Sequence, residues 1–342
     1  MRRRYDKLGV MLRIALPTLA ITAVFSLVPT VARAQTFESV GTRAQGMGGA
    51  FVAVADDASA VFWNPAGLAL GGSYFSLVID GGVGEAKPDG ELQAGSRSST
   101  LISFSTLPLG LSYYRLSATR IVPPATVLSP VPVVGVNRLT THHAGVTFVQ
   151  SVTSKFAIAS TLKLVRGLAA SADVTAANRE DLLDGAGDLA DKSTTEGDAD
   201  IGVMARFGQF RAGLTIRNVT EPDFETPDGS EIKLARQTRA GVAYSGLPGL
   251  MFAADIDLER AEGLLGDVRN LAGGVEARLH PRVAARTGFR MNTLSDEPGG
   301  HAPAYSLGGS FAVFRAMFVD GQVTLGSEAA DRGWGIAARL VY

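Results

Sequence analysis

The sequence predicts an all-β protein, a transmembrane antiparallel β-barrel of about 14 strands. Apolar and polar residues alternate from Tyr74 to the C-terminus, as in strands with two different faces. The connections between these segments are long and short in turn, as in outer-membrane barrels. After the N-terminal segment, no apolar run is long and uninterrupted enough to form a spanning helix. Without a spanning helix, a closed β-sheet is the structure that can pair every backbone N–H and C=O group within a bilayer.

Composition excludes several other classes of protein. The 342 residues are 46% hydrophobic and 19% charged, with a formal net charge of −1, which is unlike a disordered chain. There is no basic excess of the kind that a nucleic-acid binder needs, so no nucleic-acid partner is expected. Cys is 0, which excludes disulfide scaffolds, thiolate metal sites and cysteine nucleophiles.

Residues 1–34 read as a secretory signal peptide. A basic start precedes the apolar stretch Ile14–Val28, and Ala32-Arg33-Ala34 is a small-x-small cleavage site. The alternative is an uncleaved anchor, but Pro17 and Pro29 interrupt a run already near the lower limit for spanning. We therefore expect an exported protein located in the cell outer membrane.

Residues 35–73 do not alternate, and turn chemistry explains much of their sequence. Asp56 or Asp57 can cap a short helix over Ala58–Trp63 by accepting its free N–H groups. Pro65 ends that helix, because the residue before a proline is pushed out of the helical region. The glycines of the opening, which include Gly48 and Gly49, permit a tight backbone.

The same stretch resembles the start of mature FadL/TodX-like outer-membrane transporters of hydrophobic compounds, and equally that of PorV-like outer-membrane proteins. Both share a Gly-rich opening, an Ala-Asp-Asp-Ala segment and an Asn-Pro-Ala motif before the first strand. The resemblance implies a fourteen-stranded barrel over residues 74–342 with residues 35–73 as a hatch in its lumen. The residues that it assigns to the hatch and its gating are Asn64, Pro65, Ala66, Gly67, Asp56, Asp57, Gly48 and Gly49. The alternative is that these residues only fix the shape of the plug.

Fourteen segments carry the period-two pattern, and most have the 9–11 residues that a tilted membrane strand requires. The thirteen connections between them alternate without exception, seven of 7 to 27 residues and six of 2 to 5. The predicted strands are 74–80, 98–106, 109–121, 139–151, 156–170, 198–207, 210–219, 234–244, 250–259, 268–280, 283–291, 305–313, 316–326 and 334–342.

Several of these strands have one almost wholly apolar face, which a membrane barrel turns toward lipid. Charged residues share the opposite face and are expected to line the lumen. They are Asp255, Asp257, Glu259, Glu276, Arg278, Arg286 and Arg290. Opposite signs on neighbouring strands form a structural ion-pair lattice or a polar wall along a ligand path, and the sequence leaves both open.

No enzymatic motif emerges, and we expect no reaction, no metal and no cofactor. His142 and His143 are adjacent on a strand and face opposite sides, which makes joint chelation improbable. The chain has no G-x-S-x-G, H-E-x-x-H or phosphate loop.

The predicted function is passive uptake of hydrophobic small molecules, such as long-chain fatty acids or aromatic hydrocarbons, through a barrel gated by the hatch. The alternative is a PorV-like barrel that does not transport and docks secreted or surface proteins. A soluble β-sandwich is the third interpretation. Expected partners are outer-membrane lipid, a hydrophobic ligand, and the outer-membrane assembly machinery through the last strand, which ends at Tyr342.

Overall fold

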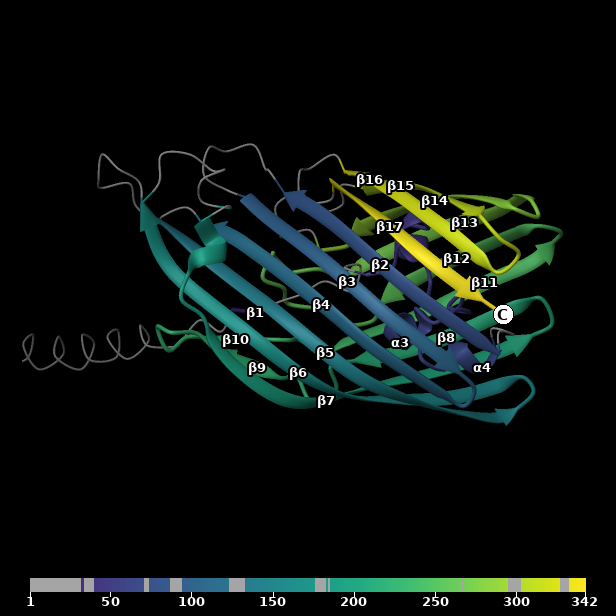
Figure 1. The fold of residues 1–342 in the computed structure, drawn as a ribbon, viewed down its shortest axis with the longest axis horizontal. Helices are drawn as coiled ribbons and strands as arrows, with labels where there is room; N and C mark the ends of the chain where they lie inside the picture. The colour runs from purple at the N-terminus through teal and green to yellow at the C-terminus, as the bar shows by residue number, and fades with distance from the viewer. Residues whose placement is uncertain are drawn as a thin grey trace, which may run out of the picture. The chain divides into compact units, whose positions relative to one another are not determined.

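The structure is a computed structural model, and it describes residues 32–33, 40–70, 74–86, 94–122, 133–175, 183, 185–265, 267–294, 303–326 and 332–342. Fourteen strands form one closed barrel, in which each strand is antiparallel to its neighbours and β17 pairs with β2 to close the ring (Figure 1). The barrel strands are β2 (Phe75–Ala86), β3 (Ala94–Thr106), β4 (Leu109–Val122), β5 (Val133–Thr153), β6 (Phe156–Thr175), β7 (Lys192–Phe207), β8 (Phe210–Arg217), β11 (Gln237–Leu247), β12 (Leu250–Asp257), β13 (Asn270–His280), β14 (Val283–Asn292), β15 (Pro303–Ala312), β16 (Met317–Gly326) and β17 (Arg332–Val341).

The alternation of connection lengths, and with it the fourteen-stranded barrel, is confirmed. Turns of two to four residues join β3 to β4, β5 to β6, β7 to β8, β11 to β12, β13 to β14 and β15 to β16, whereas the other connections have five to nineteen residues. The main difference lies at the long-loop ends, where β5 begins at Val133 instead of the predicted residue 139. The residues of β5 before position 139 still pair with β4 and β6, although apolar and polar residues do not alternate among them.

The apolar faces point outward and the charged faces inward. Phe210, Phe252 and Ile256 are 56%, 39% and 45% exposed, whereas Asp255 and Arg217 are 2% and 3% exposed. A soluble sandwich would have the opposite polarity, so that interpretation is wrong. The outward apolar face is the arrangement of a barrel that meets hydrocarbon.

Exposed aromatic side chains gather at the short-turn end. Phe207 and Phe210 flank one tight turn, Phe314 lies in another, and Tyr74 and Tyr342 lie where the first and last strands meet; all five are 56–81% exposed. Such aromatic residues form girdles where a barrel wall leaves the hydrocarbon.

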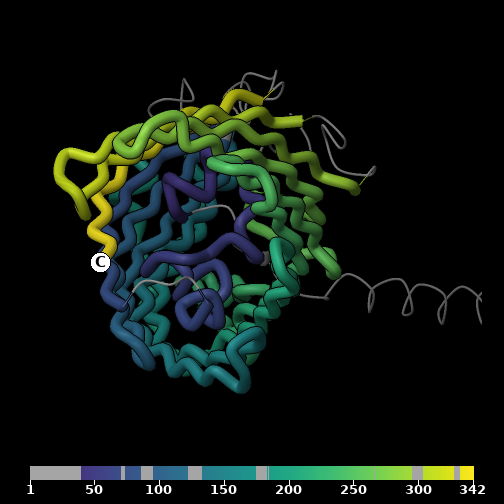
Figure 2. Tube along the Cα trace, turned by 90° about the vertical axis from the view of Figure 1, so that its right-hand side faces the viewer, coloured from purple at the N-terminus to yellow at the C-terminus, as the bar shows by residue number. Residues whose placement is uncertain are grey.

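Residues 40–70, which we call the inner segment, lie inside the ring of strands (Figure 2). The segment contains three short helices, α2 (Thr42–Gly46), α3 (Ala60–Trp63) and α4 (Gly67–Leu70). Every residue except Asp56 and Ala69 is buried. Its apolar side chains form the largest buried cluster with inward residues of the wall, such as Tyr114 and Met204.

The connection between β8 and β11 folds into the long-loop end of the barrel. It contains β9 (Asp223–Glu225) and β10 (Glu231–Lys233), which form a small sheet with β1 (Ala32–Arg33). Phe224, Ile232 and Leu234 pack with inward apolar residues of β5 and β6. We call this connection, residues 218–236, the loop cap. Apart from Ala32 and Arg33, the predicted signal peptide lies outside the described residues.

Candidate functional site

The Asn64-Pro65-Ala66 turn joins the inner segment to the barrel wall. α3 ends at Trp63, and Asn64 is extended at φ −160° and ψ 102°, as expected before a proline. The Asn64 Nδ2 group donates to the carbonyl oxygens of Val52 and of Val203 on β7, at 3.0 Å each. A single side chain therefore links two parts of the inner segment to one strand.

Glycines in the wall allow this close approach. A Cβ on Gly202 would lie 2.3 Å from Asn64 Oδ1, and a Cβ on Gly213 would lie 2.7 Å from the Val52 carbonyl oxygen. Gly274 on β13 and Gly288 on β14 likewise lie against the Met47 backbone, where an added Cβ would clash. At these glycines the inner segment contacts the backbone of the wall directly, and a side chain at any of these positions would displace it.

Gly48 and Gly49 have φ angles of 67° and 86°, in the left-handed region that favours glycine. Gly48 also lies against the Phe289 backbone, where an added Cβ would meet the nitrogen at 2.6 Å. Both the turn and its seat on β14 therefore require glycine at position 48.

Two wall carboxylates accept hydrogen bonds from the inner segment's backbone. Asp80 accepts from the N–H groups of Gly41 and Thr42, at 3.2 and 2.6 Å. Asp255 accepts from those of Phe51 and Val52, at 2.8 and 2.9 Å. These bonds satisfy buried donors that would otherwise cost free energy, and they anchor the inner segment to β2 and β12.

The predicted capping by Asp56 or Asp57 takes a different form. The helix begins later, at Ala60, and its N-cap residue Ser59 makes no side-chain capping bond. Asp57 instead accepts from the backbone N–H of Ser59 at 3.0 Å, while Asp56 pairs with Arg43. Asp57 therefore accepts one backbone N–H just before α3, as predicted, whereas Asp56 forms an ion pair instead of a cap.

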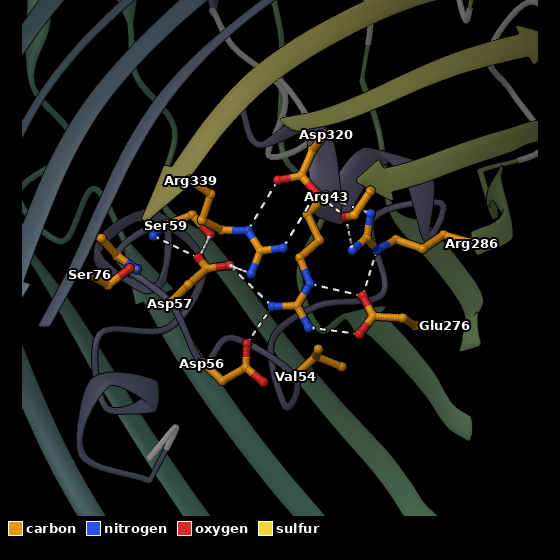
Figure 3. A network of polar contacts seen from close by, with 12 residues as sticks. Arg43, Val54, Asp56, Asp57, Ser59, Ser76, Glu276, Arg286, Asp320 and Arg339 are labelled. Carbon is orange, nitrogen blue, oxygen red and sulfur yellow. Dashed lines mark hydrogen bonds and ion pairs between the residues drawn. The ribbon is translucent and has the colours of Figure 1, made fainter. Parts of the chain in front are cut away.

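Beside this turn lies a set of seven buried or partly buried charged side chains, which we call the inner ion network (Figure 3). Arg43 is at its centre and pairs with Asp56, Asp57 and Glu276. Arg286 and Arg339 extend it to Asp320 on β16. The members are Arg43, Asp56, Asp57, Glu276, Arg286, Asp320 and Arg339.

The network favours the charged forms of Arg43 and Asp57. Burial disfavours a charged guanidinium, but the carboxylates of Asp56, Glu276 and Asp57 together raise the pKa of Arg43 above its ordinary value. Burial likewise opposes the Asp57 carboxylate, but Arg339, Arg43 and hydrogen bonds from Ser59 lower its pKa.

A cavity of about 360 Å³ opens beside the inner ion network. Arg43, Glu276 and Arg286 line it together with Arg278, which lies near the β13–β14 turn, and the ring of Phe318. Its lining is largely ionic, so this space suits polar groups better than hydrocarbon.

A second charged group, which we call the central charge cluster, lies between the inner segment and the loop cap. Lys163 on β6 is fully buried and pairs with Asp198 at 3.0 Å and Asp200 at 2.7 Å on β7. Its ammonium also donates to Asn218 of the loop cap at 3.0 Å. The Arg217 guanidinium lies 3.6 Å from the ring centroid of Phe62 in α3. The cluster therefore connects the wall to both structures that fill the lumen.

Five of the seven predicted lumen charges lie where they were expected. Asp255, Asp257, Glu276, Arg286 and Arg290 are inward and largely buried. Asp257 pairs with Arg239, whose Nη1 donates to the Gly49 carbonyl oxygen at 3.5 Å.

The other two predicted charges are exposed, and of these Arg278 still lines the lumen cavity. The placement of Glu259 in the lumen is wrong, because β12 ends at Asp257 and Glu259 is exposed beyond it, where it pairs with Arg236. Arg278 is exposed where the cavity opens.

Sequence reasoning missed Arg43, Asp80, Asp320 and Lys163. Asp80, Asp320 and Lys163 lie at inward positions of strands that were correctly predicted, so their alternation phase could have identified them. Arg43 lies within the Gly-rich opening, where no periodicity assigns it a side.

No helix in the described parts of the chain is both long and apolar enough to cross a membrane. Within the same described ranges, no three His, Asp or Glu side chains are grouped to hold a metal ion.

The chain was compared with protein-family models, curated proteins and solved structures. A family model described as "F plasmid transfer operon, TraF, protein" matches residues 133–257. No curated protein matches the chain.

Several solved structures are similar over nearly their whole length. The Pseudomonas putida toluene transporter TodX superposes with a TM-score of 0.60 at 10% identity, covering 90% of this chain and 97% of TodX. The CymD monoaromatic hydrocarbon channel gives 0.61 at 13% identity, covering 90% and 98%. A Pseudomonas aeruginosa FadL homologue gives 0.58 at 9% identity, covering 89% and 98%. The chain has the FadL/TodX-like fold.

Proposed function

We propose that this protein is an outer-membrane barrel for passive uptake of hydrophobic small molecules, gated by the inner segment. The observation that carries the proposal is a closed fourteen-stranded wall whose outward face is apolar and whose lumen holds a separate folded segment. The fold is similar to that of TodX and CymD, which are described as a toluene transporter and a monoaromatic hydrocarbon channel.

The proposal requires movement. The inner segment is almost wholly buried against the wall, and the loop cap packs inside the long-loop end. A hydrophobic molecule could pass along the lumen only if one of these structures shifted. The Asn64 amide and the carboxylates of Asp80 and Asp255 hold the inner segment through hydrogen bonds, which can break and re-form.

Uptake into liposomes tests the function directly. The full chain is reconstituted, and the entry of a radiolabelled long-chain fatty acid and of toluene is measured against empty liposomes. Liposomes that contain an unrelated barrel of similar diameter control for leakage. We expect faster entry of at least one of these compounds with the protein, and equal rates in all three preparations would reject uptake.

A docking barrel is the second candidate. It is favoured by the density of the lumen, where glycines of the wall lie directly against the Met47 and Val52 backbone. Pull-down of a stoichiometric surface or secreted partner, together with no uptake in liposomes, would favour docking.

The proposed location assigns roles to the barrel's ends. The short-turn end, with its exposed aromatic residues, would face the periplasm, and the long connections would face outward. Tyr342 is bonded through its backbone to Phe75 and Tyr74 of the first strand. The final strand ending at Tyr342 would then be the signal that the assembly machinery reads.

A further inference from the structure

The outer wall carries a row of basic side chains, two arginines and one histidine, across three adjacent strands. Arg115 on β4 lies directly opposite His142 on β5, and His142 lies directly opposite Arg166 on β6. The flanking members of the row, Thr100 on β3 and Thr195 on β7, are uncharged. Adjacent strands are about 4.8 Å apart, so all three basic side chains can reach one group bound on the wall.

The row faces away from the lumen. On each strand its residue alternates with buried inward neighbours, Tyr114 and Leu116 on β4, Thr141 and His143 on β5, Val165 on β6. Arg166 is exposed, and Arg115 and His142 are partly exposed. These side chains therefore lie on the outer surface of the barrel.

Within the described residues, no carboxylate pairs with the row. Among the residues that the structure describes, Arg115 has one long hydrogen bond, 3.5 Å to the Ser98 hydroxyl, and Arg166 forms no ion pair. Near the row on β5, Arg138, which lies four residues before His142, pairs with Asp191 in the connection that precedes β7. The two guanidinium groups, which flank the His142 ring without a counter-charge, repel one another.

His142 is oriented for an external acceptor. Tyr113 OH lies 2.8 Å from His142 Nδ1. When the phenol donates to Nδ1, the ring carries its proton on Nε2, which is then free to donate outward; this tautomer is assigned from the hydrogen bond.

On β5 and β6 the row lies at the boundary of the apolar band. Eleven residues separate His142 from the end of β5 at Thr153, which at ~3.3 Å per residue and ~45° tilt is a height of about 26 Å. That matches the ~25 Å apolar band of membrane barrels. All outward residues between the row and the β5–β6 turn are uncharged: Ala144, Val146, Phe148, Gln150 and Val152 on β5, and Phe156, Ile158, Ser160, Leu162 and Leu164 on β6.

We propose that Arg115, His142 and Arg166 bind the phosphate of an anionic membrane-lipid headgroup at the long-loop boundary of the bilayer. A phosphate has the charge and the acceptor oxygens to neutralise the row, and guanidinium groups bind it with two parallel hydrogen bonds. This inference depends on the proposed membrane location, since only there does the row meet headgroups.

Lipid binding to the purified full chain tests the inference. Detergent-solubilised protein is titrated with phosphatidylglycerol, lipid A or phosphatidylcholine, and lipid adducts are counted by native mass spectrometry. We expect preferential binding of the two anionic lipids by the wild type, and at least about tenfold weaker binding by Arg115→Gln/Arg166→Gln, since hydrogen bonds to charged groups are each worth ~1.5–3 kcal/mol. The control Arg282→Gln/Arg315→Gln removes the same charge from exposed turns at the other end and should bind like the wild type.

The outcomes separate this inference from the proposed location. Equal binding of anionic and neutral lipids by the wild type, or equal losses in both double variants, would overturn the inference. Displacement of the lipid by inorganic phosphate at equal concentration would show that a free anion, not a headgroup, is the ligand. Failure of the wild type to float with neutral phosphatidylcholine vesicles would instead reject the membrane location itself.

Discussion

Arg43 of the inner segment and Glu276 of β13 form a two-point ion pair, with Nε to Oε2 at 2.9 Å and Nη2 to Oε1 at 3.0 Å. The two residues are 233 positions apart in the chain. The same guanidinium reaches Asp56 and Asp57 within the inner segment. Arg43 therefore fixes the internal fold of the segment and its attachment to the wall at once.

Replacing Arg43 with Gln should destabilise the folded barrel by about 3 kcal/mol, because removing one partner leaves buried carboxylates without their counter-charge. Thermal unfolding of the detergent-solubilised protein, followed by circular dichroism, measures the loss. Arg282→Gln, at an exposed turn, is the control and should change little. An unchanged melting temperature for Arg43→Gln would show that the network contributes no stability.

Gly213 of β8 should tolerate no side chain. In Gly213→Ala the new Cβ would lie 2.7 Å from the Val52 carbonyl oxygen and 2.8 Å from Asn64 Nδ2. Because a backbone atom must move, we expect a loss of about 1–3 kcal/mol of unfolding free energy. Gly321→Ala on β16 is the matched control, since nothing lies within 4 Å of its added Cβ. Equal stability of the two variants would contradict close seating of the inner segment.

The barrel could be predicted from sequence, whereas its interior could not. Alternation assigns each strand residue to a face, so the outward Phe252 and inward Asp255 follow from local order alone. The pairing of Arg43 with Glu276 depends on how residues 40–70 fold within the lumen, and that segment has no period. Asn64 illustrates the limit: its extended backbone follows from Pro65, but its bond to Val203 does not.

Glu259 shows a different limit. The alternating pattern of β12 continues through Leu258 and Glu259, but pairing with β13 reaches only Ile256. Periodicity gives the face of a residue without giving the point where the strand ends. The same ambiguity affects the first residues of β5, which extend beyond the apolar band.

Acid should destabilise the protein through Asp57. Its folded pKa lies below that of the unfolded chain, about 4, so the ionised carboxylate contributes its full stability above that pH. This contribution is lost as pH falls below about 4 and through the lower folded pKa. The unfolding free energy measured from pH 6 to pH 3 should therefore fall more steeply in the wild type than in Asp57→Asn. Asp188→Asn, at an exposed site, should keep the wild-type slope; equal slopes in all three proteins would exclude Asp57 as the acid-sensitive group.

A disulfide between the inner segment and the wall tests whether uptake requires the segment to move. A Cβ on Gly335 would lie 2.9 Å from Thr42 Oγ1, close to the Cβ–S separation across a disulfide, and the chain has no other cysteine. Oxidised Thr42→Cys/Gly335→Cys should take up a hydrophobic substrate more slowly than the wild type in liposomes, and reduction should restore the rate.

The matched control joins two wall strands and leaves the inner segment free. A Cβ on Gly145 of β5 would lie 2.9 Å from Ser112 Oγ on β4, so Ser112→Cys/Gly145→Cys has the same local geometry within the wall. Its uptake should not depend on oxidation, because adjacent barrel strands do not separate during gating. The oxidised Thr42→Cys/Gly335→Cys variant could instead transport at the wild-type rate while mass spectrometry shows a complete disulfide. That result would mean that the α2 end of the inner segment stays fixed during passage. The substrate must then cross by displacement of the loop cap or through the wall.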